Sequence, residues 1–173
     1  MKIQKICAVS LFTAAALIVF VIEAQLPPLS FCPMFKPGLA NVVTLFILFA
    51  GGSWKVRDSS IVLALRIVLG ALITGAMMTV LFSAVGGIFA MLFMCLGKKL
   101  FNGSFIPTVS IMGAFGHNIG QMLTAVVVYG SFSVVWYLPI MLMGGILSGA
   151  LTGFCVCLIR KNRPFMNMIR NIK

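Results

Sequence analysis

A series of long apolar runs, separated by short polar or basic stretches, constrains this chain more than any other feature. Apolar helices of about 17 to 25 residues match the hydrocarbon core of a bilayer. The first run, from Ile6 to Ile22, is longer than the apolar part of a secretory signal, which has about 7 to 15 residues, and no clear small-x-small cleavage site precedes Pro27. We therefore expect a retained first transmembrane helix in an integral membrane protein.

Composition supports a membrane protein and argues against nucleic acid as a partner. Of the 173 residues, 61% are hydrophobic and 9% are charged, whereas soluble domains have about 25% charged residues. The net charge of +11 comes from basic residues placed between the apolar runs, and no aromatic-basic RNA motif accompanies them. An anionic cytoplasmic membrane surface explains such a charge distribution.

The apolar runs predict a single all-α domain over residues 1–173, built as a bundle of six transmembrane helices. The expected ranges are 5–24, 37–51, 60–82, 85–96, 106–129 and 134–159. The second and fourth are short for a hydrocarbon core of roughly 30 Å, so we expect them to tilt or to continue irregularly inside the protein. The turn between the third and fourth helices is placed at SAVGG, residues 83–87.

The distribution of basic residues predicts the orientation in the cell membrane. With the N-terminus in the cytoplasm, the outer loops carry Lys36 alone, and the C-terminus with its basic tail 160–173 is also cytoplasmic. The eleven basic residues then on the cytoplasmic side are Lys2, Lys5, Lys55, Arg57, Lys98, Lys99, Arg160, Lys161, Arg163, Arg170 and Lys173.

Small residues and one charge indicate how the helices pack. Gly145, Gly149 and Gly153 recur every four residues, a spacing that lets helices approach closely in lipid, and we interpret it as packing inside the chain. Arg66 lies within the third apolar run, where a charge is costly. We expect it to extend toward the inner end or to pair with Asp58.

The scarcity of acidic residues argues against catalysis by this chain alone. Glu23 lies near the outer end of the first helix and Asp58 in a cytoplasmic loop, whereas Mg²⁺-dependent diphosphate chemistry needs several carboxylates close together. The chain has no GxxxxGK[ST] phosphate loop, and its five cysteines show no metal-binding spacing. We expect neither a cofactor nor a metal.

Polar residues in the fifth helix are the first candidate ligand-binding residues. His117 and Gln121 are one turn apart and share a helix face, with Asn118 beside them. Leaving such groups buried and unpaired costs roughly 1–3 kcal/mol each, so they need partners. We interpret them as ligand contacts, with a network of interhelical hydrogen bonds as the alternative.

The predicted outer loop and its surroundings supply a second set of candidates. The stretch PPLSFCPMFKPGLAN is stiffened by prolines and rich in apolar residues, which suits either a lid or a loop that dips into the membrane interface. Lys36 is expected to pair with Glu23 or with an anionic ligand group, or to anchor the loop at the interface. Asn41 lies one turn into the second helix, and Tyr137, before Pro139, is expected to face the same side as the lid.

Five segments together resemble a known family. The chain resembles the Gx-transporter family, commonly labelled heptaprenyl diphosphate synthase component I, which is similar to the substrate-binding S components of energy-coupling factor (ECF) transporters. The segments that carry the resemblance are KPGLANVVTL (36–45), RIVLGALITG (66–75), LFSAVGG (81–87), GAFGHNIGQ (113–121) and YLPIMLMGGILSGALTG (137–153).

The resemblance implies the six-helix S-component fold and a ligand pocket open to the outside. It also implies docking onto a transmembrane coupling subunit, powered by cytoplasmic ATPases, through a small-residue face of the first helix, approximated here by Ser10, Ala14 and Ala15. The aspartate-rich motifs of prenyl chain synthases are absent.

Three functions follow as hypotheses. The first is a substrate-binding subunit of an uptake transporter for a small molecule. The alternative is a non-catalytic accessory subunit in heptaprenyl diphosphate or isoprenoid synthesis. A membrane scaffold without a ligand is the third.

Overall fold

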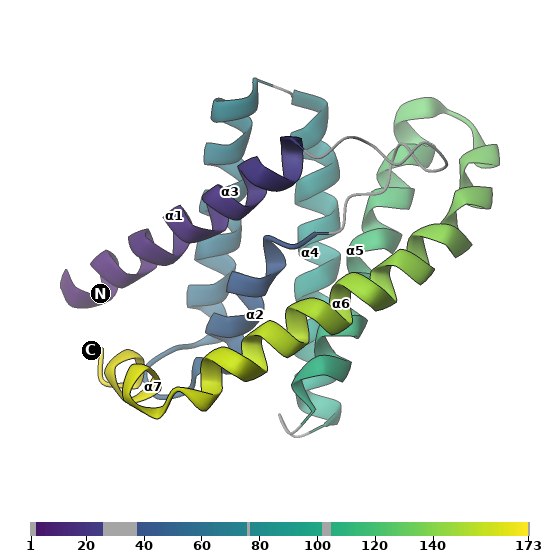
Figure 1. The fold of residues 1–173 in the computed structure, drawn as a ribbon. Coiled ribbons are helices and arrows are strands. Elements are labelled where there is room, and N and C mark those ends of the chain that lie inside the picture. The colour runs from purple at the N-terminus through teal and green to yellow at the C-terminus, as the bar shows by residue number, and fades with distance from the viewer. Residues whose placement is uncertain (1–2, 26–37, 76, 102–104, 173) are drawn as a thin grey trace.

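The protein is a bundle of helices in which α3, α4 and α5 stand nearly upright while α1 and α6 cross them at a slant (Figure 1). The computed structural model describes residues 3–25, 38–75, 77–101 and 105–172. Within these ranges all regular secondary structure is helical. The elements are α1 (Ile3–Gln25), α2 (Asn41–Ala50), α3 (Val56–Thr74), α4 (Met77–Leu100), α5 (Ile106–Tyr129), the 3-10 helix η1 (Phe132–Tyr137), α6 (Leu138–Lys161) and α7 (Arg163–Arg170).

Four stretches of helix in the described residues are long and apolar enough to cross a membrane. They are Ile3–Glu23, Val80–Leu100, Ile106–Tyr129 and Phe132–Lys161. The all-α, multi-pass membrane class predicted from the sequence is therefore confirmed. The six-span count stays a prediction, because α2 has only 10 residues and α3 carries Arg57, Asp58 and Arg66 within 19 residues.

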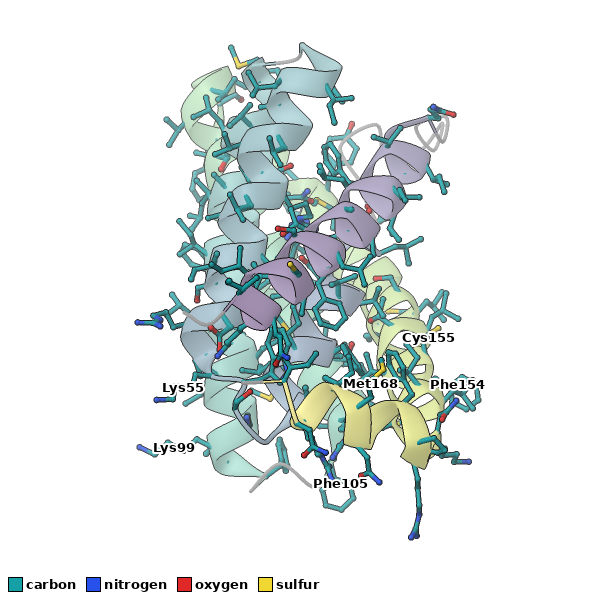
Figure 2. The ribbon with its side chains drawn as sticks, turned by 90° about the vertical axis from the view of Figure 1, so that its left-hand side faces the viewer. Lys55, Lys99, Phe105, Phe154, Cys155 and Met168 are labelled. Atoms are coloured by element: carbon teal, nitrogen blue, oxygen red, sulfur yellow. The ribbon has the colours of Figure 1, made fainter. Side chains whose placement is uncertain are left out.

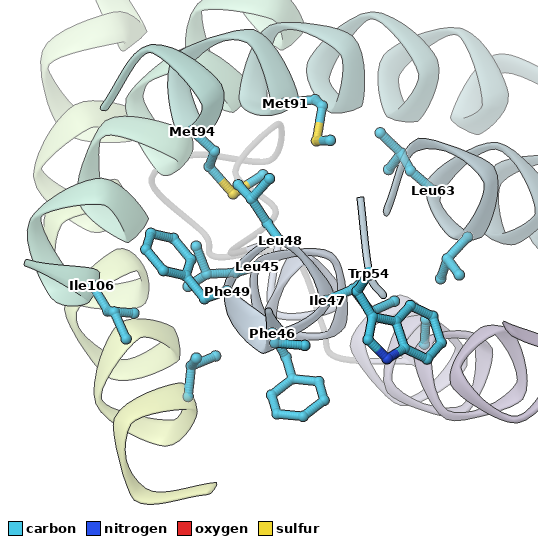
Figure 3. Packing of buried hydrophobic residues seen from close by; sticks show 14 of the residues in the cluster. Leu45, Phe46, Ile47, Leu48, Phe49, Trp54, Leu63, Met91, Met94 and Ile106 are labelled. Atoms are coloured by element: carbon cyan, nitrogen blue, oxygen red, sulfur yellow. The ribbon is translucent and has the colours of Figure 1, made fainter. Parts of the chain in front are cut away.

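The short helix α2 forms the centre of the apolar core. Residues 44–50 are all buried, and the side chains of Leu45 to Phe49 radiate from α2 toward the surrounding helices (Figure 3). They meet Leu63 of α3, Met91 and Met94 of α4, and Ile106 of α5. Ten residues of helix span about 15 Å, and a helix that is apolar all round is one that the protein itself covers. The sequence correctly predicted a short second helix.

The turn between α3 and α4 differs from the prediction. We placed it at SAVGG with a short fourth helix over 85–96, but α3 ends at Thr74 and α4 runs unbroken for 24 residues from Met77. Gly75 adopts φ +64° and its N–H donates to the Ala71 carbonyl (2.9 Å), which closes α3 as a left-handed glycine cap. Gly86 and Gly87 instead lie inside α4, where they allow neighbouring helices to approach.

The glycines of α6 pack against α5, as the sequence predicted. A Cβ atom added at Gly149 would lie 2.8 Å from Ile111 Cα, and one added at Gly153 would lie 2.6 Å from Pro107 Cα. Both distances are shorter than real Cβ contacts and involve backbone atoms. The two helix backbones can therefore approach this closely only because these positions lack side chains.

The start of α1, the end of α2, the start of α3 and α7 meet at one end of the bundle, which we call the basic end. Lys5 Nζ lies 2.7 Å from Asp58 Oδ2, and Trp54 Nε1 donates to the Ile169 carbonyl (2.9 Å). Arg170 Nε donates to the Ala50 carbonyl (3.1 Å), a favourable place for a cation because helix carbonyls are left open at a C-terminus. In Figure 2, α7 lies across this end.

Candidate functional site

His117 lies in a polar region inside the bundle, enclosed by Gly38 and Gly86. Its side chain is 6% exposed. A Cβ atom at Gly38 would lie 3.2 Å from its Cδ2 atom, and one at Gly86 would lie 2.8 Å from its Nδ1 atom. The imidazole is thus held between the backbone that leads into α2 and the backbone of α4.

Glu23, near the end of α1, binds the backbone at the start of α2. Its carboxylate accepts hydrogen bonds from Gly38 N (2.5 Å) and Ala40 N (3.4 Å). Glu23 is buried, and a negative charge is favourable where the N–H groups of a helix start are open. Glu23 therefore fixes the segment that covers His117.

Arg66 of α3 faces the same interior. Its side chain is 4% exposed and is attracted electrostatically by the negative charge of Glu23. Its Nε atom has no hydrogen-bond partner among the described residues. The prediction that Arg66 extends to the inner end or pairs with Asp58 was wrong, since Asp58 pairs with Lys5. Eight residues separate Asp58 from Arg66, which is about 12 Å along a helix at 1.5 Å per residue.

Two small cavities, which we together call the polar chamber, flank the contact between His117 and Gly38. Each has a volume of about 20 Å³. Roughly 10–15 Å³ is enough for one water molecule, so each cavity is of water size. The first is lined by Phe20, Glu23, Gly38, Arg66, Ser83, His117 and Gln121. The second is lined by Gly38, Asn41, Leu45, Met94, Ser110, Gly113, Ala114, His117, Ser148, Gly149 and Thr152.

Polar atoms of the chamber have unused hydrogen-bonding capacity within the described part of the chain. Gln121 Oε1 and Asn41 Oδ1 are buried atoms without a partner there, in addition to Arg66 Nε. Each such atom costs about 1–3 kcal/mol if nothing else satisfies it. The hydroxyls of Ser110 and Thr152 instead bond each other at 2.7 Å.

The structure brings three of the six predicted ligand-binding residues together. Asn41, His117 and Gln121 line the chamber. Asn118 points toward α6, where its Nδ2 atom donates to the Met141 carbonyl (2.5 Å). Tyr137, at the end of η1, is 42% exposed and lines neither cavity.

Lys36 and residues 27–37 of the predicted lid or interface loop lie outside the described residues, whereas residues 38–41, the end of that stretch, are described. The predicted role of Lys36 stays a prediction.

The predicted docking residues lie on the outer surface of α1. Ser10, Ala14 and Ala15 are exposed, whereas Ala16 is fully buried against the bundle. The helix thus presents small side chains outward, and their use for docking stays a prediction.

Sequence reasoning left Glu23, Arg66 and Ser83 out of the ligand site. A usable signal existed for the first two, because a charge inside an apolar helix marks a functional site by default and its partner carries the opposite sign. Ser83 carried no such signal, since SAVGG was assigned to a turn.

The chemistry of the chamber favours binding through hydrogen bonds. It combines a carboxylate, a guanidinium, an imidazole, two carboxamides and several hydroxyls. Among the residues that the structure describes, no three His, Cys, Asp or Glu side chains gather to hold a metal ion.

Fold and chamber define an all-α, multi-pass membrane protein with a polar interior site. The model of the family described as heptaprenyl diphosphate synthase component I matches residues 12–159, so the chain belongs to this family. The matched range runs from α1 through most of α6 and includes every residue of the chamber. Comparisons with curated proteins and with solved structures find no match.

Proposed function

We propose that this protein is the membrane substrate-binding subunit, of the S-component type, of an energy-coupling-factor uptake transporter for a small molecule. The polar chamber carries the proposal. A membrane bundle gains nothing in stability from buried polar atoms that lack partners, and ligand sites combine an apolar enclosure with a few placed polar groups.

Ligand binding in this proposal joins the two cavities. Sites for small molecules have volumes of about 300–1,000 Å³, far above the 20 Å³ of each cavity. The contact of Gly38 with His117 separates them, so displacing the segment that begins at Gly38 creates one larger site. Glu23, which holds Gly38 N, controls that displacement.

The partners in this proposal are a transmembrane coupling subunit and cytoplasmic ATPases. The exposed small side chains Ser10, Ala14 and Ala15 provide a smooth face on α1 for close helix packing. The basic end faces the cytoplasm, in agreement with the distribution of basic residues.

Native mass spectrometry of the purified protein tests the proposal. We expect a small molecule to co-purify with the wild type and with Thr124→Val, and to be lost from Gln121→Leu. Thr124 lies on the same helix and is also buried, but its hydroxyl donates to the Gly120 carbonyl of its own helix (3.0 Å). Ligand-free protein in every preparation, with no uptake defect on deletion of the gene, would contradict the proposal.

A second function is favoured by a different observation, an apolar groove between α3 and α4. The groove has a volume of about 410 Å³. Its lining residues are Ser60, Leu63, Ala64, Ile67, Val68, Ala84, Ile88, Met91 and Leu92. In this alternative the protein is a non-catalytic accessory subunit of heptaprenyl diphosphate synthesis, in line with the description of its family, and the groove holds a prenyl chain.

Basic side chains lie where the diphosphate of such a molecule would be. Arg57 is three residues from Ser60, and Lys99 is two turns from Leu92, so each lies near the same face as the groove. Lys55 and Lys99 project from one side of the bundle in Figure 2. All three basic side chains are exposed.

Filling the groove tests this alternative. Ala84→Trp is expected to shorten the prenyl chains made in the cell, whereas Leu72→Trp, at an exposed position of α3 outside the groove, leaves their length unchanged. Unchanged chain length on deletion of the whole gene would remove the alternative.

A further inference from the structure

The apolar groove between α3 and α4 opens to the outside of the bundle, where lipid surrounds a membrane protein. Leu63 and Met91 are buried at its floor, whereas Ala64, Ile88 and Leu92 are exposed at its rim. Its volume of about 410 Å³ lies within the range of ligand sites, about 300–1,000 Å³. A lipid chain can therefore enter the groove from the bilayer.

The groove has the length of one membrane leaflet. Its lining extends from Ser60 to Val68 on α3 and from Ala84 to Leu92 on α4. Each of these stretches is eight residue steps long, which is about 12 Å at 1.5 Å per residue. The hydrocarbon core of a bilayer is about 30 Å thick, so that one leaflet contributes about 15 Å. The groove thus matches the apolar chain of a lipid from a single leaflet.

Two exposed basic side chains continue the groove at one end. Arg57 precedes Ala64 by seven residues and Lys99 follows Leu92 by seven. Seven residues are close to two helical turns, so both side chains lie on the groove face of their helices. Because α3 ends at Thr74 and α4 begins at Met77, the start of α3 and the end of α4 lie at the same end of the bundle (Figure 1).

Lys99 is free for a ligand, whereas its neighbour Lys98 is not. The Lys98 Nζ atom donates to the Leu48 carbonyl (2.5 Å) and lies 5.4 Å from the centre of the Phe49 ring, so this side chain is bound to α2. Lys99 instead projects from the side of the bundle (Figure 2).

Acidic side chains do not neutralise Arg57 and Lys99. The whole sequence contains two of them, and neither falls outside the described residues. Asp58 is buried and pairs with Lys5 at 2.7 Å. Glu23 is eighteen residues from Lys5 along α1, which is about 27 Å of helix. An anionic group between Arg57 and Lys99 would therefore meet uncompensated positive charge.

We propose that the groove holds one anionic phospholipid of the cytoplasmic leaflet, with an apolar chain between α3 and α4 and its phosphate between Arg57 and Lys99. In the orientation predicted from the basic residues, this end faces the cytoplasm, where the leaflet carries anionic lipids. The inference does not depend on the proposed transport function. It gives the groove a different occupant from the prenyl diphosphate of the alternative function, because the groove opens to the bilayer and has the length of one leaflet.

Native mass spectrometry of the purified full-length protein, with equal amounts of phosphatidylglycerol and phosphatidylcholine added in detergent, tests the proposal. Both lipids have a phosphate and two acyl chains, but only phosphatidylglycerol has a net negative charge. We expect the wild type to retain one phosphatidylglycerol in preference to phosphatidylcholine. Each basic side chain near an anionic lipid contributes roughly fivefold, so Arg57→Gln combined with Lys99→Gln should weaken this retention roughly 25-fold. Filling the groove by Ala64→Trp should abolish it.

Two control variants match these changes. Lys161→Gln combined with Arg163→Gln removes the same charge from exposed positions outside the groove, and Leu147→Trp places a bulky side chain at an exposed position of α6. Both are expected to retain phosphatidylglycerol. An equal loss in the two charge variants would indicate general attraction by basic residues and would overturn the site. Equal retention of the two lipids by the wild type would overturn the role of the charge.

Addition of farnesyl diphosphate separates the inference from the alternative function. Retention of phosphatidylglycerol in the presence of equimolar farnesyl diphosphate is expected. Its displacement would overturn the phospholipid as the occupant and would favour a prenyl diphosphate. Should Ala64→Trp fail to fold, Ile88→Trp, at an exposed position on the α4 side of the groove, gives the same readout.

Discussion

The imidazole of His117 in α5 lies directly against the backbone of Gly86 in α4, where a Cβ atom would be 2.8 Å from Nδ1. The Cβ atom added at Gly86 would also be 3.2 Å from Gln121 Cγ. One glycine in the middle of a membrane helix therefore sets the position of two chamber residues. The segment LFSAVGG thus lies within α4 and contributes Ser83 to the chamber wall, and it does not form a turn.

Replacing Gly86 by alanine is expected to disturb the chamber. The added methyl group must displace His117, and overpacking of this kind costs about 1–3 kcal/mol, more than the roughly 1 kcal/mol that alanine gains over glycine in a helix. We expect a lower Tm and weaker ligand retention in native mass spectrometry. At Gly87→Ala the new methyl meets the flexible end of Leu63 at 3.1 Å, so a smaller effect is expected there. Equal losses in the two variants would contradict this account.

Replacing Gly153 by alanine is expected to separate α5 from α6. Its Cβ atom would lie 2.6 Å from Pro107 Cα, and a backbone atom cannot rotate away. We predict a destabilisation of about 1–3 kcal/mol by overpacking, measured by unfolding in detergent. Leu151→Ala, at an outward-facing position of α6, serves as the control. A Gly153→Ala protein as stable as the wild type would refute the close packing.

Removing the charge of Lys5 is expected to destabilise the basic end. Lys5 pairs with Asp58, which is fully buried, and breaking a buried ion pair from one side costs about 3–5 kcal/mol. Lys5→Met should therefore lower Tm far more than Lys55→Met, whose side chain is exposed. Combining Lys5→Met with Asp58→Asn should recover part of the loss, because no uncompensated buried charge remains. A double variant less stable than Lys5→Met alone would argue against the pair.

Deleting α7 is expected to expose Trp54. The indole is 7% exposed and its Nε1 atom donates to the Ile169 carbonyl. In a Trp136→Phe background, which removes the other tryptophan, deletion of residues 163–173 should shift the emission of Trp54 to longer wavelength. The substitution Met168→Ala, at an exposed position of α7, should leave the emission unchanged. An unshifted spectrum after the deletion would mean that α7 does not cover Trp54.

Much of the helical framework was predictable because it depends on local pattern. The runs behind α1, α5 and α6 are long and apolar, and the predicted range 106–129 agrees with Ile106–Tyr129. The turn before α4 was not predictable in the same way. Gly75 and the Gly86–Gly87 pair both interrupt apolar sequence, and no local signal distinguishes a glycine that ends a helix from one that lets a neighbouring helix approach.

The site was predictable only in part, for a geometric reason. His117 and Gln121 share a face because they are four residues apart. Asn118 is adjacent in sequence but turned about 100° around the helix at 3.6 residues per turn, so it meets α6 and the Met141 carbonyl.

The sequence by itself determined the membrane class, the principal helices, the short buried α2 and the clustering of basic residues, because these follow from apolar length and local charge. Only the tertiary structure decided that Glu23 and Arg66, far apart along the chain, face one cavity beside His117. The physical reason is that an apolar side chain is stable against any part of the protein interior or against lipid. A buried charge or carboxamide instead needs a particular partner, and helix packing alone decides which partner is within reach.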